Sequence, residues 1–204
     1  MLLGLITLCP SSSLKARLYR LLGADIGKNI YFAPDVVISC GDMNKVKLGD
    51  SSSFGLGTKV LCENIVVGKR VRMGGDCNIR GDGHIVIGDD VFVGVGCILD
   101  CNGELLIDDG VQIAPGARIL THDTSGNYYC KEPIPFQRTW IMARAYIGAG
   151  AIVLPGVSVG CEAIVGAGAV VTKNVQAGDT VVGVPARPVK KEMVEGNVRR
   201  QNEA

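Results

Sequence analysis

The sequence has few aromatic residues and few histidines. Its 204 residues include one tryptophan, five tyrosines, four phenylalanines and two histidines, whereas glycine occurs 28 times. With so few rings, a thick packed core is not expected, and the 47% apolar content favours a narrow interior of aliphatic side chains. The same apolar content is too high for a disordered chain.

Charge imbalance, paired cysteine motifs and long apolar runs are also missing. The net charge of +1 argues against a nucleic-acid binder. The eight cysteines form no CxxC pair and mostly stand beside aliphatic residues, so we expect buried, free thiols in a reducing cytoplasm. The apolar stretches 1–9 and 145–161 are too short, or too rich in glycine and proline, to predict a membrane span.

Two histidines cannot supply the three imidazoles of a carbonic-anhydrase type of zinc site, and no other metal-ligand spacing occurs. The glycines form neither GxGxxG nor GxxxxGK[ST], which argues against a Rossmann or P-loop nucleotide site. We therefore expect no bound metal.

A six-residue period of apolar residues runs through most of the chain. Near the C-terminus it comprises Ile141, Ile147, Val153, Val159, Val165 and Val171. Upstream it yields four triplets: Leu48, Phe54 and Val60; Val67, Met73 and Ile79; Ile87, Val93 and Leu99; Ile107, Ile113 and Ile119. Neither a helix nor an ordinary strand has this period.

The period predicts an all-β fold, a parallel β-helix whose coils have three short faces with one apolar side chain each. Successive triplets start 19, 20, 20, 34 and 18 residues apart, and every surplus over 18 follows the third face. One edge should therefore carry all the insertions, including a long loop over 121–140. Insertions on one side of a repeat protein usually mark its binding face.

The two ends differ from the repeats. Residues 11–23 have a serine at the start, an amphipathic pattern and a glycine stop, which predict a helix that caps the first coil. A cationic helix at a membrane surface is the alternative for this segment. We thus divide the chain into a helical cap (1–25), a β-helix with its loop (26–184) and a basic tail (185–204), for which a helix or a solvated end is expected.

The loop edge carries the candidate chemistry. Counting three residues past each third face gives Glu63, Asp82, Asn102 and His122, which should stack as a polar ladder. A histidine there can act as a general base near neutral pH, although a structural surface histidine is an alternative. His84 stands in a turn and is expected to be structural.

The chain resembles the hexapeptide-repeat acyltransferases of the left-handed β-helix superfamily, in particular the galactoside, maltose and surface-polysaccharide O-acetyltransferases. The resemblance covers nearly the whole chain: the repeats, "THD" before a long loop, "YIGAGAIVLPGVSVGCEAIVGAGAVVTKNV", and the ending "VVGVPARPVKK". It implies left-handed coiling, acetyl-CoA as acyl donor, and a homotrimer with active sites between subunits.

Carried over to matching positions, the resemblance makes His122 catalytic and assigns Asp100, with Asn102 nearby, to acceptor binding. Relatives have an asparagine eight residues before this aspartate, where this chain has Phe92. Cations near the C-terminus would attract the phosphorylated ribose of the donor. The residues assigned to acetyl-CoA are Tyr146, Ala149, Ala167, Thr172, Lys173, Arg187 and Lys190.

The resemblance implies an acetyl-CoA-dependent O-acetyltransferase that acts on a hydroxyl of a sugar or a surface-polysaccharide precursor, and the free thiols predict a cytoplasmic location. Transfer would be direct, with His122 as general base. N-acetylation of a nucleotide-linked amino sugar is the nearest alternative, and a non-catalytic β-helix scaffold is another. Peripheral contact with a membrane through the N-terminal helix also stays open.

Overall fold

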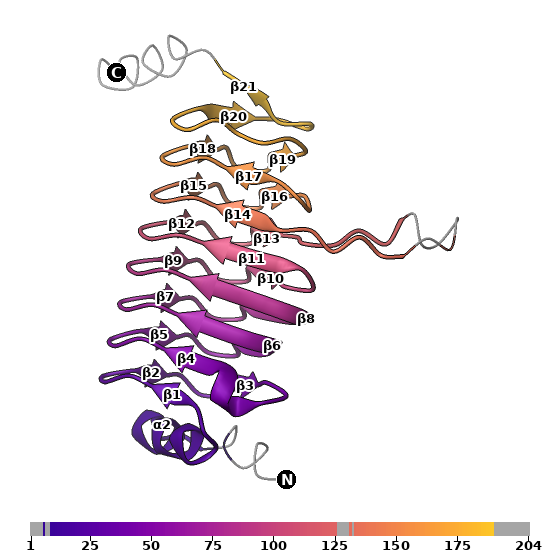
Figure 1. The fold of residues 1–204 in the computed structure, drawn as a ribbon. Helices are drawn as coiled ribbons and strands as arrows, with labels where there is room; N and C mark the ends of the chain where they lie inside the picture. The colour runs from indigo at the N-terminus through magenta and orange to yellow at the C-terminus, as the bar shows by residue number, and fades with distance from the viewer. Residues whose placement is uncertain (1–5, 7–8, 126–130, 132, 190–204) are drawn as a thin grey trace, which may run out of the picture.

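The computed structural model describes residues 6, 9–125, 131 and 133–189. The chain winds into a stack of three-sided rungs along one axis, from the N-terminal helix at one end to the last strands at the other (Figure 1). All paired strands in the stack are parallel until the final pair. The expected parallel β-helix is confirmed.

Three faces make up the stack, and we number them in the order in which the chain meets them. The first face consists of β1 (Asp25–Ile26), β4 (Val46–Leu48), the second halves of β6 (Lys59–Val67) and β8 (Asn78–Ile87), β11 (Glu104–Ile107), β14 (Thr139–Ile141) and β17 (Ser158–Val159).

The second face forms a separate nine-stranded sheet. It consists of β2 (Tyr31–Phe32), β5 (Ser53–Phe54), β7 (Arg72–Met73), β9 (Phe92–Val93), β12 (Gln112–Ile113), β15 (Tyr146–Ile147), β18 (Ile164–Val165), β20 (Thr180–Val182) and β21 (Arg187–Pro188).

The third face is joined to the first because β6 and β8 continue through the bend between them. It consists of β3 (Val37–Ser39), the first halves of β6 and β8, β10 (Ile98–Asp100), β13 (Arg118–Ile119), β16 (Ile152–Val153) and β19 (Val170–Val171). We call the edge between the third and first faces the loop edge.

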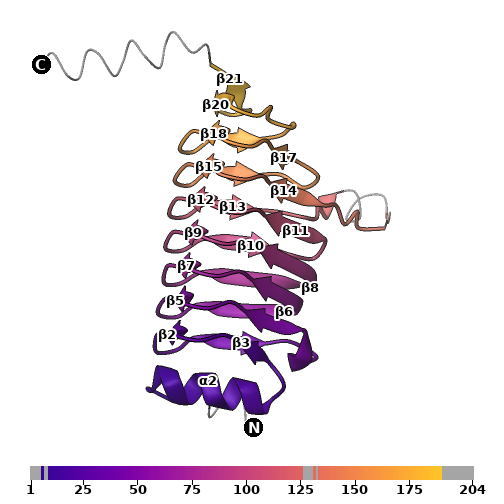
Figure 2. The ribbon, with the colours of Figure 1, turned by 60° about the vertical axis from the view of Figure 1, so that its left-hand side comes forward.

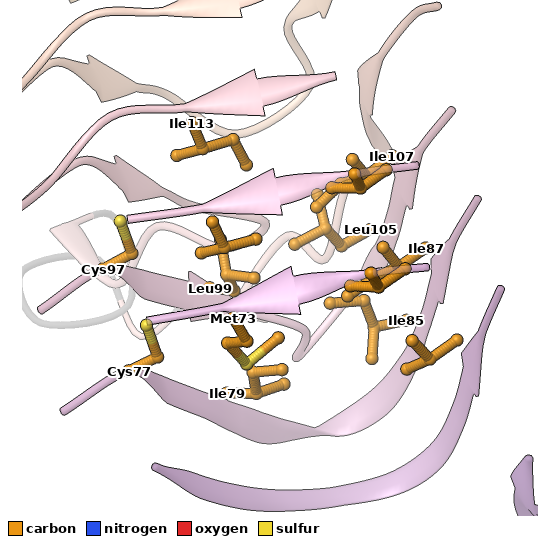
Figure 3. Close-up of a cluster of buried hydrophobic side chains, with 14 of the residues drawn as sticks. Met73, Cys77, Ile79, Ile85, Ile87, Cys97, Leu99, Leu105, Ile107 and Ile113 are labelled. Carbon is orange, nitrogen blue, oxygen red and sulfur yellow. The ribbon is translucent and has the colours of Figure 1, made fainter. Parts of the chain in front are cut away.

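The six-residue period sets the register of the rungs. On the third face, directly paired residues are Val60, Ile79, Leu99, Ile119, Val153 and Val171. These residues are buried with those of the other faces in one continuous core. Figure 3 shows part of this core, with Ile79 and Leu99 of the third face beside residues of the other two. The sequence-based assignment of these positions to the interior is therefore confirmed.

The structure adds a rung before the predicted ones and continues beyond the last. Ile26, Phe32 and Ile38 are buried and keep the six-residue step, but ten residues separate Ile38 from Leu48 because the 3-10 helix η1 (Met43–Lys45) intervenes. At the other end, buried Val175 follows Val171 by four residues. Both irregular steps interrupt the period.

Both ends of the core are covered. Helix α2 (Ser12–Leu21) lies across the first rung (Figure 2), and the Ser11 side chain accepts a hydrogen bond from the Leu14 backbone N–H at 3.4 Å. Its Lys15 is buried, and the ammonium donates to the Ala33 carbonyl at 3.1 Å. At the other end, β21 pairs antiparallel with β20. No helix in the described part of the chain is long and apolar enough to cross a membrane.

Candidate functional site at the loop edge

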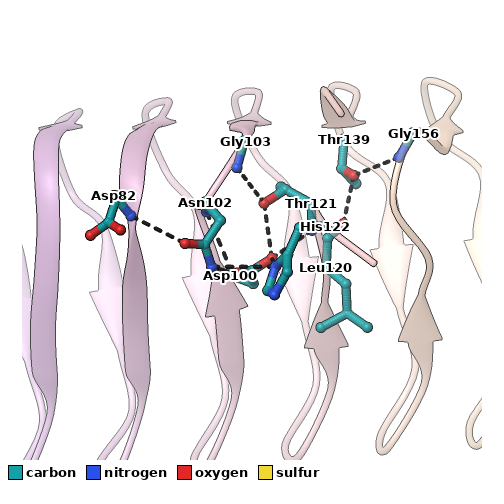
Figure 4. A network of polar contacts seen from close by, with 9 residues as sticks. All are labelled: Asp82, Asp100, Asn102, Gly103, Leu120, Thr121, His122, Thr139 and Gly156. Atoms are coloured by element: carbon teal, nitrogen blue, oxygen red, sulfur yellow. Dashed lines mark hydrogen bonds and ion pairs between the residues drawn. The ribbon is translucent and has the colours of Figure 1, made fainter. Parts of the chain in front are cut away.

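His122 lies where the chain leaves the third face and enters the long loop (Figure 4). The preceding strand, β13, pairs with β10 below it, so the residues after the two strands meet at the loop edge. Thr121 is fully buried, whereas the His122 side chain is 29% exposed. The fold thus anchors the backbone here and leaves part of the imidazole accessible.

Asp100 is the hydrogen-bond acceptor at the centre of this site. One carboxylate oxygen, Oδ2, accepts from the Thr121 backbone N–H at 2.8 Å, the Thr121 hydroxyl at 2.9 Å and His122 Nδ1 at 2.7 Å. The other, Oδ1, accepts from Asn102 Nδ2 at 2.6 Å. Burial alone would raise the pKa of Asp100, but the hydrogen bonds from Thr121, His122 and Asn102 outweigh it and hold this pKa below its ordinary value.

The ionised Asp100 fixes the tautomer of His122. A carboxylate only accepts hydrogen bonds, so the 2.7 Å contact requires the proton of the neutral imidazole to be on Nδ1. The lone pair of Nε2 then remains available to accept a proton. This pairing of a buried carboxylate with a partly exposed imidazole is the arrangement of a general base with its orienting group.

Asn102 connects this pair to the rung below. Its side-chain oxygen accepts from the Asp82 backbone N–H at 3.3 Å, and its Nδ2 lies 3.3 Å from His122 Nδ1. Three of the four residues expected in the polar ladder are therefore linked (Figure 4). Asn102 donates to Asp100, and Asp100 in turn holds His122. The assignment of Asp100 and Asn102 to acceptor binding stays a prediction.

Glu63, the fourth expected member of the ladder, does not join it. The register shifts between Cys62 and Asn64, because this rung is one residue shorter than the next. Glu63 instead forms an ion pair with Lys45 at 2.7 Å. Glu63 and Asp82 still line one surface pocket, so the count places Glu63 on the loop edge, although its carboxylate bonds Lys45 and not the other three residues.

The two histidines have different surroundings. His84 Nε2 donates to Glu104 Oε1 at 2.9 Å, and Glu104 also accepts from Arg138, which lies at the base of the long loop. His84 thus belongs to a surface hydrogen-bond network on the first face, in which Arg138 and Glu104 form an ion pair.

The returning part of the loop is held by contacts near His122. Phe136 forms an isolated bridge with His122, and their ring centroids are 6.4 Å apart. The buried hydroxyl of Thr139 donates to the Leu120 carbonyl at 2.7 Å and accepts from the Gly156 backbone at 3.2 Å. The described base of the loop is therefore fixed to the rungs on both sides.

The residues assigned to acetyl-CoA fall into two groups. Lys173 and Arg187 line one pocket at the C-terminal end of the stack, and Thr172 is exposed next to them. Tyr146 is on the outer side of the second face, and Ala149 and Ala167 are exposed just after strands of that face. Lys190 lies outside the described residues. In a three-sided stack the second face is opposite the loop edge, so one chain does not bring the second group to its own His122.

Thr121 is the residue of the site that the sequence analysis did not identify. Its hydroxyl donates to Asp100 and accepts from the Gly103 backbone at 2.9 Å. The only sequence signal is that it directly precedes a candidate catalytic histidine. Among the described residues, no group of three histidine, cysteine or acidic side chains is arranged to hold a metal.

Solved structures with the same stack of rungs are acetyltransferases. The chain matches no family model and no curated protein sequence. A maltose O-acetyltransferase from Clostridium difficile 630 is 20% identical, with a TM-score of 0.54, over 93% of this chain and 82% of that one. A hexapeptide-repeat-containing acetyltransferase from Vibrio cholerae O1 biovar eltor, in complex with acetyl coenzyme A, is also 20% identical, with a TM-score of 0.55 and the same coverage.

A third similar structure is a mutant of AntD, an N-acyltransferase from Bacillus cereus, in complex with dTDP-4-amino-4,6-dideoxyglucose and coenzyme A. It is 20% identical, with a TM-score of 0.61, over 91% of this chain and 94% of that one. The chain has the fold of the hexapeptide-repeat acetyltransferases. At 20% sequence identity, these similarities establish the fold.

Proposed function

We propose that the chain is an acetyl-CoA-dependent O-acetyltransferase for a hydroxyl of a sugar or a surface-polysaccharide precursor. The observation that carries this proposal is the His122–Asp100 pair on the edge of a hexapeptide-repeat fold, in which Nδ1 is bonded to Asp100 and the ring is partly exposed, so that Nε2 is the nitrogen that would accept a proton. The similar structures named above are acetyl- or acyltransferases, which supports the same chemistry.

In the proposed reaction, His122 Nε2 takes the proton of the acceptor hydroxyl as the hydroxyl oxygen attacks the thioester carbonyl of acetyl-CoA. A backbone N–H stabilises the tetrahedral oxyanion. The carbon–sulfur bond then breaks, and the leaving thiolate takes the proton from the imidazolium. Asp100 keeps Nδ1 protonated throughout and stabilises the positive charge on the ring. The acetyl group passes directly to the acceptor.

The complete site is proposed to lie between subunits of a homotrimer. The loop edge and the second face of one chain point away from each other, so a neighbouring chain would bring its Tyr146, Ala149 and Ala167 to His122. Lys173, Arg187 and Lys190 would bind the phosphates of the donor. We retain the division into a cap (1–25), a β-helix (26–184) and a tail (185–204).

We further propose a cytoplasmic location. The cysteines in the described part of the chain are all free, and five of them are buried, as expected in a reducing compartment. Peripheral contact of the N-terminal helix with a membrane stays a prediction.

The test is release of free coenzyme A from acetyl-CoA in the presence of sugars, oligosaccharides and nucleotide-linked sugars. We expect His122→Ala to lower kcat by about 10²- to 10⁴-fold, the range for loss of a general base. His84→Ala is the matched control and should retain activity. Equal activity of both variants would contradict the proposed base, and no thiol release with any acceptor would favour a non-catalytic scaffold.

N-acetylation of a nucleotide-linked amino sugar is the second candidate. Its support is the likeness to AntD, whose complex contains an amino sugar linked to dTDP. A preference for such an acceptor over free or oligomeric hydroxyl sugars in the same assay would favour it.

A further inference from the structure

A pocket of about 420 Å³ lies on the loop edge, nearer the N-terminus than His122. Its lining includes Ser39, Leu61, Glu63, Gly81 and Asp82. These residues come from the ends of three successive rungs, those of β3, β6 and β8. We call it the distal pocket. Its volume is within the range of ordinary ligand sites.

The distal pocket and His122 lie on one continuous edge. Asp82 lies within β8, at the bend between its two halves, and His122 follows β13, which is two rungs further along the stack. At about 4.8 Å per rung, the Asp82 and His122 backbones are separated by about 10 Å along the axis, and Ser39 is about 19 Å from His122. Asn102 joins the two ends, since it is bonded to the Asp82 backbone and lies against His122.

The distance between the distal pocket and His122 sets the minimum length of an acceptor that contacts both. One hexose ring with its reacting hydroxyl at His122 is too short to enter the distal pocket. Two or three linked rings laid along the edge are long enough. An extended acceptor is therefore the occupant that accounts for a pocket at this position.

The chemistry of the lining distinguishes between extended acceptors. Ser39, Glu63 and Asp82 offer oxygen atoms to sugar hydroxyls, and the 44% exposed Leu61 offers an apolar surface to the C–H face of a ring. Lys45 pairs with Glu63 and lowers the pKa of this carboxyl, so Glu63 is ionised at neutral pH. None of the residues that line the pocket is cationic, and Lys45, which pairs with Glu63, balances one of the two carboxylates. The pocket thus keeps a net negative charge that would repel a diphosphate, whereas a neutral sugar would not be repelled.

We propose that the distal pocket binds the far sugar units of a neutral oligosaccharide whose reacting hydroxyl lies at His122. The inference rests on the proposed acetyl transfer and specifies its acceptor. The binding residues are Glu63 and Asp82, with Leu61 as the packing surface. The distal pocket would favour an oligomeric acceptor over a free monosaccharide and over a nucleotide-linked sugar.

The experiment measures thiol release with neutral saccharides of one to four units and with nucleotide-linked sugars. We expect kcat/KM to rise about tenfold or more from one to three units. Asp82→Asn should lower kcat/KM for the trisaccharide about tenfold more than for the monosaccharide, through KM. The isosteric Asp25→Asn, at an exposed carboxylate on the first rung, is the control and should not change this ratio.

Three results would overturn the proposal while the proposed function stands. They are equal use of one and three units, an equal effect of Asp82→Asn on both, and a nucleotide-linked sugar as the best acceptor. No thiol release with any acceptor would instead overturn the proposed function, and the pocket assignment with it. Thermal unfolding of Asp82→Asn and Asp25→Asn, compared with the wild type, establishes that both variants are folded.

Discussion

At the scale of single residues, the loop edge depends on one buried carboxylate. Asp100 is 3% exposed, and its two carboxylate oxygens accept hydrogen bonds from Thr121, Asn102 and His122. The neighbouring Leu99 is buried as well, so the usual alternation of strand side chains ends here. The backbone turns at the edge and brings the carboxylate inside, where each hydrogen bond favours its charged form.

The Asp100→Asn variant tests this role. Because hydrogen bonds to a charged group are lost, we expect the free energy of unfolding at pH 7 to fall by about 2 kcal/mol. The turnover number kcat should fall, because an amide does not hold Nδ1 protonated, whereas KM for acetyl-CoA should change little. Urea unfolding and thiol-release kinetics measure the two effects.

The difference in free energy of unfolding between wild type and Asp100→Asn should shrink as the pH falls. The pKa of Asp100 is lower in the folded protein than in the unfolded chain, so the unfolded chain binds the proton more readily. The stabilisation is complete above the unfolded value of about 3.9 and is lost as the pH falls through the folded value. Wild type and Asp100→Asn should therefore converge in stability below about pH 4, and a difference that grows in acid would contradict the assignment.

At the scale of the rung, close backbone approach at the loop edge requires glycine. Gly81 has a φ of +145°, and a Cβ on it would lie 2.3 Å from the Asn102 backbone nitrogen. The next rung therefore packs directly against this position. The approach also brings Asn102 within reach of the Asp82 backbone.

We expect Gly81→Ala to lower the free energy of unfolding by about 1–3 kcal/mol, because it adds both strain and a clash. Gly41→Ala is the control: it lies on the same edge, has no positive φ, and a Cβ there would meet no atom within 4 Å. Urea unfolding of the two variants is the measurement. Equal destabilisation would show that the contact with Asn102 does not limit the approach of the rungs.

The rungs also show how far the sequence alone predicts this molecule. The six-residue period identified the inward residues because one apolar side chain per face is a local requirement of the coil. It failed at Ile38 and at Val175, where an inserted helix and a four-residue step interrupt it. Counting found His122 and Asn102, but no pattern in the sequence shows that Asp100 turns inward and bonds Thr121, since that depends on the register between rungs.

At the scale of the whole molecule, the proposed site requires more than one chain. His122 is on the loop edge, and Ala149 follows a strand of the opposite face. A trimer would bring such positions of neighbouring chains together, with the same contact repeated three times. Light scattering that showed an active monomer would contradict this arrangement.

Mixed trimers give a sharper test. His122→Ala removes the base, and Ala149→Trp places a large ring in the proposed donor groove. When the two inactive chains are unfolded and refolded together, each interface has about one chance in four of combining an intact base with an intact groove, so about a quarter of wild-type activity should return. Refolding His122→Ala with His122→Gln is the control and should restore none. A site within one chain predicts no recovery in either mixture.

The last strand pair has a consequence for self-association. A stack of parallel rungs ends in a strand with unpaired backbone groups, and such an end would template another copy and allow filaments to grow. Here β21 runs in the opposite direction beside β20, and its Pro188 has no N–H to offer a further strand. With α2 across the first rung, this arrangement opposes end-to-end growth of the stack that the structure describes.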